Sequence, residues 1–379
     1  MKKLLIGTTA LVSALMVANV ASAQTAPELK VGMDLRFWAN MVDDDEVGAE
    51  DREFRVDYRM PITITGKTDS GLTYGGYVRI RTSRAATFSA ALPQPGGDNR
   101  SDLYVDYGFV HIGGAFGKLE FGENDGPMTV TYVAAPTVGA MQINDAGNAF
   151  NGVIGVGNFR YGSALYLDQS TRINYYTPVF SGFQAAIGYA PEMGSRGLNV
   201  HRFADPATNA AGTPSIQDAF EMAVVWTGNF DPATVKASVG YATGSASTVA
   251  LNDLDVLQAG LNVGFGPWTV GGAYYDNKDT RSLAHDKEAG WNVGASWKQG
   301  ALGVAASYGR TKTEYTAVSG LADTDDTMYG IGANYLLAPG LHLDADLVFV
   351  DSESYTPVGR PALSGNEGNV LTLRTRLLL

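Results

Sequence analysis

Residues 52–66, with the sequence REFRVDYRMPITITG, alternate strictly between two kinds of side chain. The apolar set is Phe54, Val56, Tyr58, Met60, Ile62 and Ile64, and the charged or polar set is Arg55, Asp57, Arg59, Pro61, Thr63 and Thr65. Because successive side chains of a β-strand point to opposite faces, the stretch predicts a strand with one apolar and one polar face. The same alternation recurs in 31–38, 72–81 and 371–379. A chain built in this way is predicted to form a large β-sheet.

The connections between the alternating segments are of two kinds. Short connections rich in turn formers occupy 68–71, 113–117, 181–182, 231–234, 266–267, 298–300 and 337–340. Long polar connections occupy 43–51, 84–102, 125–170, 193–217, 245–253, 279–287, 316–326 and 355–368. The two kinds follow one another in turn, which is typical of antiparallel strands with tight turns at one rim and large loops at the other. Seven short turns and eight long loops predict about sixteen strands.

Composition favours a membrane barrel over a soluble protein. The chain has 379 residues, 46 of them glycine and 19 tyrosine, and only 17% are charged. A soluble protein would need an enormous core to bury about sixteen apolar stripes. Closing the sheet into a barrel instead turns the apolar stripes outward onto lipid. Aromatic residues recur beside the short turns, where the barrel would meet the lipid headgroups. The charged stripe of Arg55 and Arg59 is therefore predicted to face a water-filled lumen.

The N-terminus predicts export. Lys2 and Lys3 precede an apolar run that ends in Ala21-Ser22-Ala23, the pattern of a signal peptide over residues 1–23. Residues 24–379 are then expected to form a single transmembrane barrel. The chain contains no cysteine, and 39 acidic against 27 basic residues make nucleic acid an unlikely partner.

Two stretches resemble a known family. GGAFGKLEFGENDG (113–126) is similar to the short-turn, strand and loop-entry segment of Gram-negative general porins, and TRINYYTPVFSGFQAAIGYAP (171–191) resembles the hairpin after that family's inward-folded third loop. The resemblance implies a sixteen-stranded barrel in the outer membrane, in contact with lipid and lipopolysaccharide. It further implies a homotrimer, short periplasmic turns, long extracellular loops and a third loop at about 125–170 inside the lumen. Its implied activity is passive diffusion of small hydrophilic solutes and ions. Unlike the family, the chain ends in Leu377, Leu378 and Leu379, and its third loop lacks a dense acidic cluster.

Seven arginines on the polar stripes of the first three strands and the last strand are predicted to form one basic wall: Arg36, Arg55, Arg59, Arg79, Arg81, Arg374 and Arg376. One interpretation is a solvated wall, partly neutralised by Asp34 and Asp57. The other is the basic half of a pore constriction, which resembles the arginine cluster of the family. The loop at 125–170 would supply the opposing acidic side, for which we expect Glu120, Glu123, Asp125, Asp145 and Asp168.

Other chemistry is weakly supported. The acidic run at 43–51 is a weak candidate for a divalent metal site through Asp43, Asp44, Asp45 and Glu46, although it lacks the spacing of a known metal loop. The four histidines are scattered and there is no catalytic motif, so neither an enzyme nor a bound cofactor is expected. A substrate-selective porin remains the nearer alternative, and a plugged structural or adhesive barrel the more distant one.

Overall fold

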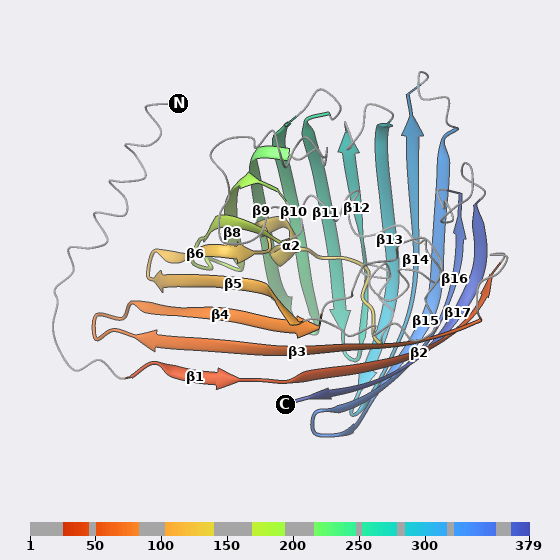
Figure 1. Cartoon of the computed structure of the whole chain (residues 1–379), viewed down its shortest axis with the longest axis horizontal. Coiled ribbons are helices and arrows are strands. Elements are labelled where there is room, and N and C mark those ends of the chain that lie inside the picture. The colour runs from red at the N-terminus through yellow and green to blue at the C-terminus, as the bar shows by residue number, and fades with distance from the viewer. Residues whose placement is uncertain are drawn as a thin grey trace.

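The computed structural model describes residues 26–44, 51–82, 103–139, 169–193, 216–247, 252–278, 285–316, 322–353 and 365–379. The predicted signal peptide at 1–23 lies outside these residues. Over the described ranges the chain forms one antiparallel sheet (Figure 1). Its strands are β1 (Glu28–Val31), β2 (Asp34–Asp44), β3 (Arg52–Lys67), β4 (Thr73–Thr82), β5 (Leu103–Gly114), β6 (Gly117–Asn124), β7 (Ser170–Tyr176), β8 (Phe183–Glu192), β9 (Ile216–Phe230), β10 (Ala233–Ala246), β11 (Leu254–Phe265), β12 (Trp268–Lys278), β13 (His285–Gln299), β14 (Leu302–Tyr315), β15 (Thr324–Ala338), β16 (Leu341–Ser352) and β17 (Asn366–Leu378).

The sheet closes on itself into a barrel. Each strand from β2 to β17 pairs with its neighbour in sequence, and β17 returns to pair with β2 along Leu378↔Asp34 to Gly368↔Asp44. β1 and β2 both pair with β3 and are separated only by Gly32 and Met33, so they form two parts of one barrel strand. The ring therefore has sixteen strand positions, and closure leaves the sheet without the open edges that a lipid environment penalises. The predicted strand number is confirmed.

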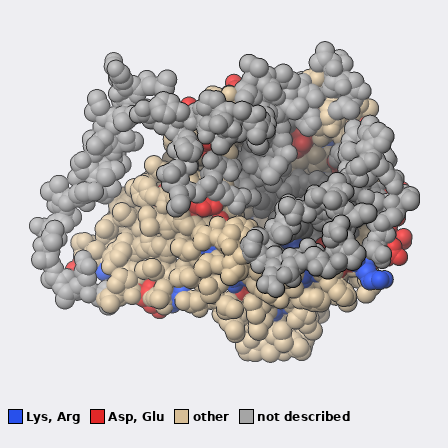
Figure 2. Space-filling view, viewed as in Figure 1, with Lys and Arg blue, Asp and Glu red and all other residues tan. Residues whose placement is uncertain are grey.

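The apolar and charged faces of β3 point in the opposite directions to those expected in a soluble protein. Phe54 is 72% exposed on the outside, whereas Asp57 on the alternate stripe is 2% exposed. Val56 and Tyr58 are likewise exposed. The surface formed by described residues in Figure 2 is mainly uncharged, with few acidic or basic groups. The apolar face therefore points outward and the charged face points into the lumen, as predicted.

Aromatic side chains on the outer face gather near both ends of the strands. At the short-turn end, Trp226 lies between Phe183 and Phe230, with ring centroids 5.9 and 5.8 Å apart. Towards the long-loop end, a row crosses four strands through Trp291, Tyr308, Tyr329 and Phe349. Tyrosine and tryptophan favour the membrane–water interface because one end of the ring system is apolar and the other polar. Two such rows are the pattern of a barrel that spans a bilayer.

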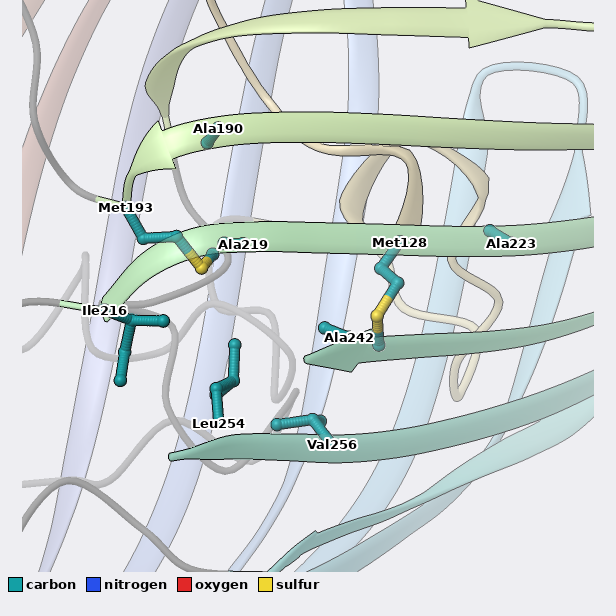
Figure 3. Close-up of a cluster of buried hydrophobic side chains, with 9 residues drawn as sticks. All are labelled: Met128, Ala190, Met193, Ile216, Ala219, Ala223, Ala242, Leu254 and Val256. Atoms are coloured by element: carbon teal, nitrogen blue, oxygen red, sulfur yellow. The ribbon is translucent and has the colours of Figure 1, made fainter. Parts of the chain in front are cut away.

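The long connection after β6 turns into the barrel. Helix α2 (Pro127–Thr131) contacts β8, β9 and β10, and residues 132–139 continue across the inner wall. Its apolar anchor is Met128, which points towards Ala242 and packs in a buried cluster with Ala223 (Figure 3). We refer to residues 126–139 as the inward segment. No helix within the described ranges is long and apolar enough to cross a membrane.

Candidate functional site: the lumen constriction

The seven predicted arginines share one inner wall, formed by β17, β2, β3 and β4. Strand register places Arg376 opposite Arg36, and Arg59 opposite Arg81. Because every one of these residues lies on the inward stripe of its strand, their guanidinium groups all face the lumen. We call this set, Arg36, Arg55, Arg59, Arg79, Arg81, Arg374 and Arg376, the arginine wall.

Buried carboxylates on the same strands and their neighbours fix the arginine wall in place. The ion pairs are Asp34 with Arg36 and Arg376, Asp57 with Arg59 and Arg81, Asp106 with Arg79 and Arg81, and Asp344 with Arg374. Asp34 and Asp57 were the neutralising groups expected from the sequence, whereas Asp106 and Asp344 were not foreseen. Charged partners that are buried together must be paired to offset the loss of hydration. These four carboxylates pair with six of the seven arginines, and Glu53 lies beside Arg55 on the inward stripe of β3.

Aromatic rings also hold the arginines. Trp38 occupies the row between Arg55 and Arg374, with guanidinium carbons 5.2 and 5.9 Å from the ring. Its side chain is largely buried, so the indole positions its neighbours. Arg79 lies 4.2 Å from the ring of Tyr107 in the same manner. A cation over an aromatic face is attracted by about 0.5–2 kcal/mol, depending on its desolvation.

The inward segment is tied to the barrel from one side of the lumen to the other. Side chains from five strands bond its backbone: Glu221 to Met128 N, Gln258 to Met128 O, Ser238 to Val133 N, Asn292 to Ala135 N and Arg374 to Gly139 O. Asn174 bonds the carbonyl oxygen of Asp125, just before the segment. The distances between these donor and acceptor atoms run from 2.8 to 3.2 Å. The described part of the predicted constriction loop therefore lies inside the lumen, whereas residues 140–168 lie outside the described residues.

Glycines on the inner wall make room for the inward segment. A Cβ atom on Gly260 would overlap the carbonyl oxygen of Val133, and one on Gly332 would lie 2.7 Å from the carbonyl oxygen of Val138. Glycine within a strand commonly marks a place where another backbone approaches closely. Part of the high glycine content is thus explained by the path of the inward segment.

At the base of the inward segment lies a buried ion pair that sequence reasoning missed. Arg172 on β7 pairs with Glu221 on β9, and the two side chains are 1% and 2% exposed. The second carboxylate oxygen of Glu221 accepts the N–H of Met128 at 3.2 Å. The signal in the sequence was one acidic residue, Glu221, within the otherwise apolar stretch 219–226 of β9.

The predicted acidic side is only partly placed by the structure. Asp125 accepts the hydroxyl of Tyr107 at 2.5 Å, so it is linked to Arg79 through that ring. Glu120 lies on β6 and pairs with Lys118 at 2.7 Å. Glu123 lies on the same strand, opposite Gly108. Asp145 and Asp168 lie outside the described residues, so an acidic side opposite the arginine wall stays a prediction.

The structure describes only part of the weak candidate for a divalent metal site. Asp43 and Asp44 end β2, while Asp45 and Glu46 lie outside the described residues. Among the residues that the structure describes, no three acidic or histidine side chains gather as metal ligands do.

Comparison with known proteins decides the family. A model of the Gram-negative porin family matches residues 7–354. The chain belongs to this family. A porin of Rhodobacter capsulatus is 26% identical over 302 residues, which cover 77% of this chain and 86% of that protein. Family membership and the barrel together identify an outer-membrane channel for passive diffusion, which confirms the expected function.

Solved porin structures share the fold. An anion-selective porin from Comamonas acidovorans superposes with a TM-score of 0.63 at 18% identity, over 93% of this chain and 100% of that one. The trimer form of OmpT from Vibrio cholerae gives 0.61 at 18% identity, over 94% and 100%.

Proposed function

We propose that this porin is a homotrimeric channel for small hydrophilic solutes and ions, and that its constriction favours anions. The observation that carries the proposal is the gathering of seven arginines on one inner wall, in a chain whose overall charge is −12. Charges within a Debye length of about 8 Å are only partly screened at physiological salt. A permeating ion passing between the arginine wall and the inward segment is therefore subject to the local positive field.

Assembly and export complete the proposal. The trimer is supported by the fold shared with OmpT of Vibrio cholerae, which forms one. Residues 1–23 direct export and are removed before Gln24, in line with the Ala21-Ser22-Ala23 pattern. The exposed apolar face and its aromatic rows contact outer-membrane lipid and lipopolysaccharide. The family is one of channels, so we propose no catalytic activity.

Reversal potentials in planar bilayers under a KCl gradient test the selectivity. The wild-type channel is expected to pass chloride in preference to potassium. Replacing Arg55 and Arg59 together by glutamate changes the formal charge of the wall by −4, so the reversal potential is expected to move towards cations. Lys236→Glu on β10, also inward-facing but outside the arginine wall, is the control and is expected to cause a smaller shift. A double variant that conducts normally with an unchanged reversal potential would contradict the proposal.

The same measurement separates the alternatives. A plugged structural or adhesive barrel would show no stable conductance in the bilayer. A purely unselective channel would give a reversal potential near the value set by free diffusion of the two ions. Cross-linking at native density is expected to give trimers, and recovery of monomers alone would refute that part of the proposal.

A further inference from the structure

A cavity of about 580 Å³ lies in the lumen beside the tip of the inward segment. Five members of the arginine wall line it: Arg36, Arg55, Arg59, Arg374 and Arg376. Trp38 and Asp57 lie among these arginines. The remaining lining comes from β13 to β16 with the turn at 300–301 and from residues 137–139, so the cavity extends along an arc of consecutive strands from β13 to β3. Its volume is in the range of pockets that bind small organic molecules, about 300–1,000 Å³.

The cavity has a second cationic side. Lys298, near the short-turn end of β13, faces inward and lines it together with Asn334 and His342. Three strands, β14 to β16, separate Lys298 from the nearest strand of the arginine wall. The ammonium group therefore reaches the cavity from a different direction than the guanidinium groups. A ligand with two separated negative charges can satisfy both sides at once, which a single carboxylate cannot do.

The charges that line the cavity do not cancel. Five guanidinium groups and one ammonium group face it, whereas the carboxylates that pair with these arginines are Asp34, Asp57 and Asp344. Six cationic groups thus line the cavity together with one carboxylate, Asp57. Each guanidinium has five N–H donors, and the ion pair of Arg376, for example, uses only Nε and one Nη nitrogen. An incoming anion can thus bind without displacing the structural carboxylates.

The cationic groups are held in place before any ligand arrives. Arg374 donates from Nε to Asp344 at 2.6 Å and from Nη2 to the carbonyl oxygen of Gly139 at 3.0 Å. Trp38 lies between Arg374 and Arg55. Since the side chains are already ordered, little conformational entropy remains to be lost on binding. Val138 and Leu336 add apolar surface for the carbon atoms of a ligand.

We propose that this cavity, the cationic niche, binds small organic dianions whose two charges are carried by separate carboxylates. The niche then acts as a resident binding site on the diffusion path, so dianion transport saturates with concentration. The inference rests on the proposed function, because it takes the arginine wall to line an open channel. It goes further by assigning a substrate class and by adding Lys298 as a specificity-determining residue.

Inhibition of the chloride current in planar bilayers tests the niche. Succinate at increasing concentration in 0.1 M KCl is expected to reduce the single-channel current with a saturating dependence, whereas acetate is not. Lys298→Gln is expected to raise the half-blocking concentration of succinate by about five-fold, the effect of one charge pair at 4 Å in water. Lys298→Arg keeps the charge and is expected to retain the block. Lys236→Gln, on the inward stripe of β10 and outside the niche, is the matched control.

The outcomes are distinct from those of the proposed function. If chloride preference is normal but succinate gives no saturable block, the niche is refuted and the proposed function stands. If Lys236→Gln weakens the block as much as Lys298→Gln, the block reflects general lumen charge, and the niche is again refuted. If the KCl gradient reveals no anion preference, the proposed selectivity itself fails. Should Lys298→Gln not assemble, Lys298→Arg with retained block and the acetate comparison still test the proposal.

Discussion

Neutralising Glu221 is expected to release the base of the inward segment. Glu221→Gln keeps the size of the side chain and an oxygen that can accept the N–H of Met128, but it removes the negative charge beside Arg172. Arg172 cannot lose its proton, so it remains charged in a site where it is 1% exposed. Breaking a buried ion pair by removing one partner costs about 3–5 kcal/mol.

That loss is expected to act locally rather than to unfold the barrel. The pair lies against the base of the inward segment, where a Cβ on Gly126 would collide with both Arg172 and Glu221. A cost of about 3–5 kcal/mol raises the population of a released segment by roughly 150-fold to 5,000-fold. Single-channel recordings are expected to show frequent transitions between conductance levels, while the folded fraction in detergent stays high.

Two controls separate this effect from a general loss of charge. Glu221→Gln combined with Arg172→Met removes both charges and keeps an acceptor for the N–H of Met128, so steady conductance is expected to return. Asp325→Asn breaks the exposed pair with Arg310, where the guanidinium side chain is 50% exposed, and is expected to cost at most about 1 kcal/mol. If the Glu221→Gln channel shows no more transitions between conductance levels than the wild type, the ion pair does not anchor the inward segment. The same conclusion follows if the double variant shows as many transitions as the single one.

Three further variants and measurements test the faces and the constriction. Val56→Arg places a charge on the lipid-facing stripe and is expected to cost roughly 2–4 kcal/mol near the bilayer midplane, seen as a lower yield of folded barrel; normal folding would mean that this stripe does not face lipid. Gly260→Ala is expected to displace the inward segment from Val133 and change the conductance, whereas Gly108→Ala, whose Cβ makes only an ordinary contact, is expected to leave it unchanged; equal effects would contradict the close approach. N-terminal sequencing of the outer-membrane protein is expected to begin at Gln24, and an intact Met1 would refute cleavage.

The barrel could be predicted from sequence because alternation is a local property. Phe54 and Asp57 differ by three positions, and that odd spacing alone assigns them to opposite faces. The alternation of short and long connections then predicted about sixteen strands. The structure differs only in that Gly32 and Met33 divide one barrel strand into β1 and β2. Alternation alone does not show whether the apolar face points inward or outward. That direction followed from the further argument that so many apolar stripes cannot share one soluble core.

The partners in the site could not be predicted in the same way, because they depend on register between strands. Arg79 and Asp106 are 27 residues apart, and Arg374 and Asp344 are 30 apart, so no short spacing pattern marks them. Lys298 enters the cationic niche only because the barrel brings β13 into the same arc as the arginine wall. The hydrogen bonds that hold the inward segment are still harder to predict, since each joins an ordinary polar side chain to a backbone atom of an irregular segment.

Arg374 connects the two systems that shape the lumen. Its Nε bonds Asp344 and its position beside Trp38 makes it part of the arginine wall, while its Nη2 holds the carbonyl oxygen of Gly139 at the tip of the inward segment. A lysine in its place would keep the charge but could not reproduce these directed contacts, because an ammonium group is a single point donor on a flexible stem. If the proposed anion preference holds, we expect selectivity and pore width to be coupled through Arg374, because the same guanidinium group contributes positive charge to the lumen and holds the backbone at Gly139.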